Sequence, residues 1–460
     1  MLPEATVHDI LTLGKSRGAD FVEVYAEESH AATLELTDRK IDTVNSGVSF
    51  GVGVRLIFGD EAYYSYSSDP ERDTLLALTD NMAASRATGA APGTISPFRV
   101  ETLQNRHPVR EFPGGVSKEE RVILLRRLDE LTRNQGEGVR QVSGRLSEKE
   151  RKIFIANSEG LWVEDSRQYA RVALAAIAEK GDGPQVASES PGALGGYEFF
   201  RELDLDRLAE DTAASALRMA DAGYIQGGVM PVVLGSGFGG VIFHEACGHP
   251  LETESVRKKA SPFAGKLGQP VAQSILTAID DGTLVNHWGS LNIDDEGMPA
   301  MRTVLIENGI LKNYLSDRIG AAQVGVPRTG SGRRESYKYA PASRMRNTYI
   351  APGPHTVEDM IASIDSGLYA RKMGGGSVDP ATGEFNFAVQ EGYAIRKGKI
   401  AEPVRGATLI GKGFEVLPLI SMIGSDLHLS AGMCGSVSGL VPTTVGQPSL
   451  KIDRILVGGR

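Results

Sequence analysis

The sequence predicts an α+β protein, with two N-terminal α+β domains that contain antiparallel sheets and a β-rich C-terminal domain. Its 460 residues exceed the size of one typical core, and both helix-spaced and alternating apolar segments occur in the first half. After residue 226 glycine becomes dense and short strand-like segments dominate. We therefore expect domains at residues 1–90, 110–222 and 226–460.

The first domain begins with a predicted helix over residues 4–18, which places Val7, Ile10 and Leu11 near helical spacing and ends at Gly18. A second helix follows Asp69, a candidate N-cap. Four alternating segments between the helices, separated by short polar turns, predict an antiparallel meander: FVEVYAEE, ATLELTD, VSFGVGVRLIF and AYYSYSS.

The second domain follows a stretch rich in proline, glycine and threonine over residues 88–115, which we interpret as a linker. The next helix begins at Ser117, which forms the spacing of a capping box with Glu120. Strand-like segments over residues 139–180 and a helix over residues 203–222 complete a second α+β domain.

The C-terminal domain consists mostly of short strands and turns. The sequences ENG at residues 307–309 and RKG at residues 396–398 are typical of hairpin turns. One of the few predicted helices in this half carries the segment FHEACGH.

Charge and hydropathy exclude several classes of function. A formal net charge of -9 without a basic block argues against direct binding of nucleic acid. No apolar segment approaches the roughly 20 residues needed to span a bilayer, and the N-terminus does not resemble a signal peptide. We expect a cytoplasmic chain without a membrane partner. In a reducing compartment Cys247 and Cys434 are then better explained by metal ligation or burial than by a disulfide.

The segment FHEACGHP at residues 243–250 resembles the HExxH zinc motif but has one residue more between its histidines. On a regular helix, His249 would lie about 140° around the axis from His244. Gly248 and Pro250 favour a distortion, either a π-bulge or a helix end, that would let both histidines bind one metal. Glu245 would then be placed to act on water. The alternative is a buried helix end whose polar side chains only satisfy hydrogen bonds.

A glycine-rich segment, GSGFGG at residues 235–240, follows an apolar strand and matches the dinucleotide-binding pattern. The surrounding elements do not form a series of βαβ units, and no ribose-binding acid follows. We expect these glycines to allow a sharp turn and close packing of the helix on the sheet. A nucleotide-binding oxidoreductase remains the less favoured alternative.

Four segments resemble the TldD/PmbA family of metallopeptidases, in the family's order: VVLGSGFGGVIFHEACGHPLE, LNIDDEGMPAMRTVLIENGILKNYL, GSGRRESYKYAPASRMRNTYI and GMCGSVSGLVPTTVGQPSLKI. TldD-type members carry HExxxH and PmbA-type (TldE) members lack it, so this chain resembles the TldD type. The resemblance implies zinc held by His244, His249 and Cys434, with Glu245 as the catalytic base. Cys247 is not part of the family pattern, and we interpret it as a small buried residue that could alternatively contact the metal.

The resemblance further implies a zinc-dependent peptidase for unfolded or small peptides, paired with a TldE/PmbA-like homologue in a heterodimer or with itself in a homodimer. Arg334, Tyr337, Arg344 and Asn347, in family-like segments, are candidates for substrate binding, with a structural polar network as the alternative. The acidic run at residues 294–296 could bind a cation, although a turn before the next strand explains it better. The rival function is a catalytically inactive, PmbA-like peptide-binding subunit.

Overall fold

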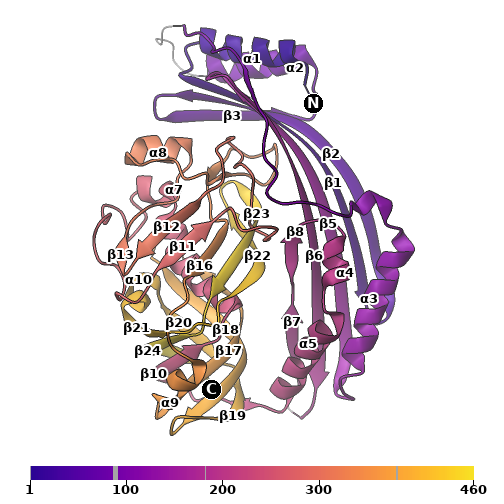
Figure 1. Cartoon of the computed structure of the whole chain (residues 1–460), viewed down its shortest axis with the longest axis vertical. Coiled ribbons are helices and arrows are strands. Elements are labelled where there is room, and N and C mark those ends of the chain that lie inside the picture. Colours follow the sequence, from indigo (N-terminus) through magenta and orange to yellow (C-terminus); the bar gives the residue numbers. More distant parts are fainter. Residues whose placement is uncertain (1, 86–91, 182, 380–381) are drawn as a thin grey trace.

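The computed structural model describes residues 2–85, 92–181, 183–379 and 382–460, and it confirms the predicted α+β class (Figure 1). Residues 88–91, at the start of the predicted linker, lie outside the described residues. A long curved sheet runs along one side of the molecule, and the C-terminal half packs against its concave side. No helix in the described part of the chain is long and apolar enough to cross a membrane.

The N-terminal half forms one sheet in the order β3-β2-β1-β5-β6-β4, and β7 and β8 also pair with β6. Its strands are β1 (Phe21–Thr37), β2 (Lys40–Phe58), β3 (Glu61–Ser67), β4 (Arg99–Glu101), β5 (Val139–Asn157), β6 (Leu161–Glu179), β7 (Pro184–Glu189) and β8 (Gly192–Leu194).

This sheet joins the two predicted N-terminal domains. β1 pairs with β5 from Glu23 opposite Asn157 to Thr37 opposite Ser143, so strands from both sides of the predicted linker form one ladder. The segments FVEVYAEE and ATLELTD, predicted as separate strands, belong to the single strand β1. Pairing on both edges, with β2 and β5, keeps the polar residues between these segments in extended structure.

Helices cover one face of this sheet. Even-numbered apolar residues of the strands, among them Val22, Leu34 and Leu146, pack against them, because successive strand residues point to opposite faces. The helices of this half are α1 (Glu4–Ser16), α2 (Arg72–Ala84), α3 (Lys118–Arg133), the short α4 (Glu198–Glu202) and α5 (Leu205–Ala220). α1 and α2 lie at one end of the sheet, and α3 and α5 lie at the other.

The helix starts agree only partly with the predicted caps. The Ser117 hydroxyl accepts a hydrogen bond from the amide of Glu120, which confirms this cap of α3. The predicted Asp69 cap is wrong, because α2 begins only at Arg72. The Asp69 carboxylate accepts instead from the Glu71 amide and the Thr74 hydroxyl just before and within the first turn.

The first sheet of the C-terminal half has the order β17-β10-β24-β20-β18-β19-β9, with β21 also paired to β24. Because β17 pairs with β18 as well, five of these strands form a closed ring. The strands are β9 (Gly223–Tyr224), β10 (Gly228–Leu234), β17 (Ser366–Val378), β18 (Glu384–Arg396), β19 (Lys399–Arg405), β20 (Thr408–Lys412), β21 (Ile420–Ile423) and β24 (Leu450–Gly458).

A six-stranded sheet in the order β13-β12-β11-β16-β23-β22 completes the C-terminal core, beside a small two-stranded sheet. The strands are β11 (Ala278–Asp281), β12 (Arg302–Glu307), β13 (Ile310–Leu311), β14 (Gly332–Arg333), β15 (Ala342–Ser343), β16 (Asn347–Ile350), β22 (His428–Ser436) and β23 (Gly439–Gln447). The predicted turns at ENG and RKG are confirmed as the β12–β13 and β18–β19 hairpins, with positive φ at Asn308 and Lys397 and at the glycine after each.

Short helices connect these strands, and the HExxxH segment lies between β10 and α7. The helices are α6 (Val241–Phe243), α7 (Thr253–Arg257), α8 (Arg318–Val324), α9 (Val357–Ala362) and α10 (Gly413–Val416). Three-residue 3-10 turns cover Pro113–Gly115, Phe238–Gly240, His249–Leu251 and Leu417–Leu419. The HExxxH segment is packed within the largest apolar core, which contains residues from both C-terminal sheets.

Candidate metal centre

The two histidines of the HExxxH segment lie on the same side of a distorted helix. His244–Gly248 forms a π-helical turn after α6, and the amide of His249 donates to the carbonyl of His244. This bond spans five residues, so it brings together two side chains that a regular helix would separate. The imidazole ring centres are 5.1 Å apart. The π-helical turn is therefore one of the two distortions that the sequence left open.

The other distortion, a helix end at Gly248, does not occur, because the chain continues into the 3-10 turn His249–Leu251. Gly248 has a right-handed helical conformation (φ -59°). Its role is close packing, since a Cβ at this position would lie 2.1 Å from the sulfur of the buried Met345.

Cys434 approaches both histidines from β22, one strand of the β22–β23 hairpin. Its Sγ lies 3.1 Å from Nε2 of His244 and 3.2 Å from Nε2 of His249. The thiol is buried, and Arg344 donates to the backbone carbonyl of Cys434 and to that of Gly439 across the hairpin. The predicted ligand residues, 190 and 185 positions apart in sequence, thus meet at one point.

These donors are suited to a zinc ion. Their ligand atoms all lie within 4.8 Å of one another. Two ligand atoms on a tetrahedral zinc are about 3.5 Å apart for ordinary Zn–N and Zn–S lengths, so small side-chain shifts would suffice. A His/His/Cys set supplies three protein ligands and leaves a fourth position for water or substrate, as in catalytic zinc sites.

Glu252, which the sequence analysis did not select, orients one of the predicted ligands. Its Oε2 lies 3.0 Å from Nδ1 of His249, and its Oε1 accepts from the amide of Met345. The carboxylate is buried, so this contact fixes the ring with Nε2 directed at Cys434. The sequence signal was present, because residues three apart on a helical turn face each other.

Glu245 lies beside the donor cluster and retains access to solvent. Its Oε2 is 3.7 Å from Nε2 of His249, and its side chain is 27% exposed, against 12% for His249. A carboxylate at this place can exchange a proton with a water molecule next to the cluster.

The surroundings of Cys434 and His249 shift the pKa values of both side chains. Burial would raise the pKa of Cys434, but the adjacent His244 and His249 lower it well below its usual range. Burial would lower the pKa of His249, whereas Glu252 and Cys434 raise it well above its usual range. The cluster therefore stabilises a thiolate, which is the form of cysteine that binds metals.

Cys247 lies outside this cluster. It is buried, it lines a small apolar cavity with Ile242 and Phe243, and burial raises the pKa of its thiol. It belongs to the apolar core rather than to the three donors that converge.

The sequence of the chain is similar to those of known metallopeptidases. Three segments match family models of the PmbA/TldA metallopeptidase. They are domain 1 (residues 22–86), the central domain (residues 111–220) and the C-terminal domain (residues 227–459). The chain belongs to the TldD/PmbA metallopeptidase family. The relatives include a Metalloprotease TldD homolog from Haemophilus influenzae, 38% identical over 100% of this chain and 97% of the relative. Another Metalloprotease TldD homolog, from Buchnera aphidicola, is 35% identical over 96% of this chain and 94% of its own.

Solved structures share the fold of this TldD/PmbA family member at low identity. A Thermotoga maritima protein described as a putative modulator of a DNA gyrase superposes with a TM-score of 0.81 at 20% identity, over 99% of this chain and 100% of that one. TldE from Thermococcus kodakarensis gives a TM-score of 0.78 at 19% identity over the same shares.

The glycines of GSGFGG serve close packing in this family member. A Cβ at Gly235 would lie 2.1 Å from the carbonyl of Arg371, and a Cβ at Gly240 would lie 2.6 Å from Gly446. β10 pairs in parallel with β17 but antiparallel with β24, so the sheet is not the parallel sheet of a dinucleotide-binding fold. These contacts favour the packing role over nucleotide binding.

The candidate substrate-binding residues are buried and engaged within the chain. Arg334 pairs with Glu23 at 2.7 Å and lies over the ring of Tyr25. Tyr337 packs edge-on against Tyr66. Both therefore contact the N-terminal sheet.

Arg344 and Asn347 have partners within the C-terminal half. Arg344 holds the β22–β23 hairpin, as described above, and also donates to the Ser438 hydroxyl. The Asn347 amide donates to the carbonyl of Asp281 and to the Ser290 hydroxyl. Of these two, only Arg344 contacts the backbone of a predicted metal ligand.

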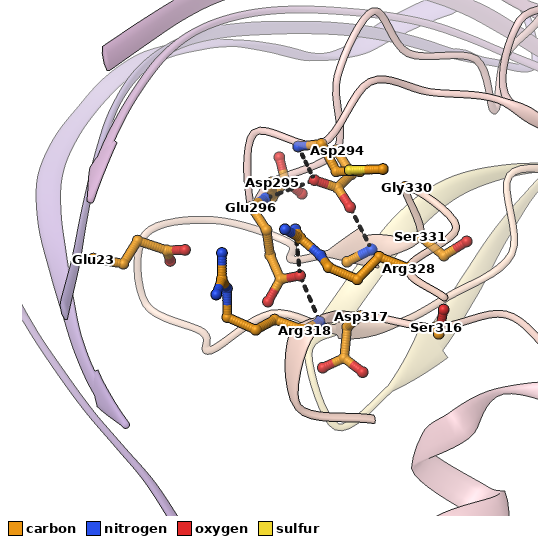
Figure 2. Close-up of polar contacts among 12 residues, drawn as sticks. Glu23, Asp294, Asp295, Glu296, Ser316, Asp317, Arg318, Arg328, Gly330 and Ser331 are labelled. Carbon is orange, nitrogen blue, oxygen red and sulfur yellow. Dashed lines mark hydrogen bonds and ion pairs between the residues drawn. The ribbon is translucent and has the colours of Figure 1, made fainter. Parts of the chain in front are cut away.

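The acidic run is a buried turn that joins the two halves of the molecule (Figure 2). Asp294 accepts from the amides of Glu296, Met298 and Gly332. Asp295 and Glu296 pair with arginines of the N-terminal sheet: Asp295 with Arg167 and Glu296 with Arg55, each at 2.7 Å. Backbone amides and arginines thus supply the partners of these carboxylates. The turn agrees with the interpretation from the sequence, which did not include the arginine pairs.

Proposed function

We propose that this chain is a zinc-dependent peptidase that hydrolyses unfolded or small peptides. The observation that carries the proposal is the convergence of His244, His249 and Cys434 on one point with Glu245 beside them. The names of its relatives place peptidase activity at the level of the family.

His244, His249 and Cys434 would hold the metal. A bound zinc would supply a Lewis acid that polarises the peptide carbonyl and makes water a better nucleophile at neutral pH. In the proposed reaction Glu245 accepts the proton of the attacking water and passes it to the leaving amine. Its partial exposure allows a peptide and water to reach it, whereas the buried ligands are protected from solvent.

Two further residues hold the ligands in position in this proposal. Glu252 keeps the Nδ1–H tautomer of His249, so that Nε2 carries the lone pair toward the metal. Arg344 ties the carbonyl of Cys434 to the turn of its hairpin through Gly439 and Ser438.

We also propose that the chain works in a dimer, either with a TldE/PmbA-like homologue or with a second copy of itself. The likeness to the solved TldE fold supports a partner of the same architecture. A reducing, cytoplasmic compartment suits a site that needs a free thiol, and both cysteines are free.

Metal analysis combined with digestion of an unstructured peptide tests this proposal. We expect one zinc per chain and cleavage of the peptide, measured with and without a co-expressed homologue. Glu245→Gln should retain zinc and lower turnover about 100-fold to 10,000-fold, as expected for loss of a general base.

Cys434→Ser and Cys247→Ala form a matched pair for the ligand assignment. The first should lose zinc and the second should keep it, since only Cys434 lies against the histidines. Turnover retained in Glu245→Gln would refute the role of this residue, and no cleavage under any condition would favour an inactive peptide-binding subunit.

A further inference from the structure

A cavity of about 790 Å³ is lined by strands of the N-terminal sheet and by residues of the β22–β23 hairpin. Along β5, alternate residues line it: Ser143, Arg145, Ser147, Lys149 and Arg151. Their neighbours Val142 and Leu146 point to the other face and pack with the helices. The strand period thus directs a row of polar side chains into the cavity, which has the size of a small-ligand site.

Three polar groups of β5 and the adjacent β6 have unused hydrogen-bonding capacity, although Nη2 of Arg171 donates to the Ser190 hydroxyl. Within the described part of the chain, the buried Tyr169 hydroxyl and Nε of Arg171 have no hydrogen-bond partner. The Lys149 ammonium has no hydrogen bond or ion pair to a described residue either. Lys149 lies directly opposite Tyr169 in the β5–β6 ladder, and Arg171 follows two residues along β6 on the same face. The three groups are therefore adjacent.

The carboxylates around the cavity already have partners. Glu35 pairs with Arg145, and Glu189 pairs with Lys372. Glu335, on the opposite wall, accepts from the amide of Leu440. Among the described residues no ion pair joins Lys149 or Arg171 to a carboxylate, although Glu335 lies in the same cavity.

Besides Glu335, the C-terminal half lines the cavity with apolar side chains. The ring of Trp288 packs edge to face against that of Tyr169, with ring centres 5.4 Å apart, and also lies against the guanidinium of Arg171. Met433 and Leu440 of the hairpin line the cavity with side chains that are 46% and 53% exposed. Exposed apolar groups of this size next to a polar row indicate a ligand with an apolar body.

We infer that this cavity binds a small organic carboxylate with an apolar body, such as the C-terminal end of a short peptide. Lys149 and Arg171 bind the carboxylate, the Tyr169 hydroxyl donates to it, and Trp288, Met433 and Leu440 contact the apolar part. The pKa values agree in direction. Burial and the nearby Arg151 lower the pKa of Lys149 by more than Glu27, Glu335 and Asp295 raise it, and burial and Arg145 lower the pKa of Arg171. A bound anion would favour the charged form of both side chains.

This site is distinct from the metal centre. Met433 and Cys434 are consecutive on β22, so their side chains point to opposite faces of the hairpin. Binding in the cavity does not require hydrolysis. It can be measured in a Glu245→Gln chain, which retains every cavity residue, so its outcome is independent of the peptidase proposal.

Calorimetric titration of the full Glu245→Gln chain with N-acetyl-Ala-Leu-Val, as free acid and as C-terminal amide, tests the inference. We expect the free acid to bind at least about tenfold more tightly than the amide, because a charge-assisted hydrogen bond would be lost. Lys149→Gln and Arg171→Gln should each weaken binding of the free acid by about tenfold or more. Trp288 fluorescence should change on binding.

Lys152→Gln is the matched control, because Lys152 lies on the same strand but is 49% exposed and outside the cavity. It should bind the free acid like the parent chain. Thermal unfolding of each variant separates lost binding from lost folding, and the acid-to-amide comparison needs no cavity variant. Any of four results would overturn the inference. The acid and the amide could bind with equal affinity, or the acid could fail to bind at millimolar concentration. The folded Lys149→Gln and Arg171→Gln chains could bind the acid like the parent chain, or inorganic phosphate could bind as tightly as the acid.

Discussion

Replacing Glu252 by glutamine tests whether this buried carboxylate prepares His249 for metal binding. In the native chain one oxygen lies 3.0 Å from Nδ1 of His249, and the other accepts from the amide of Met345. A glutamine has one carbonyl oxygen and one NH₂ group, so it can accept only one of these bonds. In Glu252→Gln, the NH₂ group of the glutamine must therefore face either Nδ1 of His249 or the amide of Met345.

The size of the effect follows from these contacts. Loss of a carboxylate that orients a metal-binding histidine typically weakens metal affinity about 10-fold to 100-fold. That range corresponds to about 1.4 to 2.8 kcal/mol of binding free energy. If the glutamine turns its NH₂ group to Met345 instead, the folded state loses one buried hydrogen bond, and the unfolding free energy falls by about 1 to 3 kcal/mol.

Competition with a zinc chelator measures the affinity, and thermal unfolding of the metal-free chain measures the stability. Glu254→Gln is the matched control, since Glu254 pairs with Arg257 and Lys258 and not with the cluster. The control should leave zinc affinity unchanged. Native zinc affinity together with native stability in Glu252→Gln would refute the reasoning, because one of the two bonds must be lost.

Two further predictions concern stability. Gly248→Ala should lower the unfolding free energy by about 1 to 3 kcal/mol through overpacking against Met345. Gly47→Ala is the control, because a Cβ at Gly47 meets nothing within 4 Å, and it should leave the unfolding free energy unchanged. Urea unfolding measures both variants. Burial would raise the pKa of Asp295, but Arg167, Arg151 and Arg334 lower it to about 2. Its stabilisation, on the order of 2 to 3 kcal/mol, should be present above the ordinary carboxyl pKa near 4 and be lost as pH falls toward 2. The measurement is the difference in unfolding free energy between the native chain and Asp295→Asn. If this difference were the same at pH 5 and pH 2.5, it would contradict the prediction.

Several local features of the fold could be predicted from the sequence, although the start of α2 could not, and neither could long-range pairing. The cap at Ser117 and the turns at ENG and RKG depend on a few neighbouring residues, and all are confirmed. The ladder between β1 and β5 joins segments more than a hundred residues apart. Nothing in either alternating segment specifies its partner, so the two N-terminal domains were expected to have separate sheets.

The site shows the same division. The spacing of His244 and His249 indicated a distorted helix, and the structure contains a π-helical turn there. Cys434 entered only through the resemblance, because no local pattern connects β22 to this helix. Whether an arginine such as Arg334 is buried or exposed depends on partners distant in sequence, here Glu23, so sequence reasoning could not distinguish substrate binding from structure.

The ladder between β1 and β5 also has a consequence for synthesis of the chain. At about 5–20 residues per second, the ribosome needs on the order of ten seconds to proceed from β1 to β5. During that interval β1 has β2 on one edge and no partner on the other, and an unpaired edge is a template for association with other chains. Nascent chains on neighbouring ribosomes, which expose the same edge of β1, are therefore the molecules with which mispairing is expected.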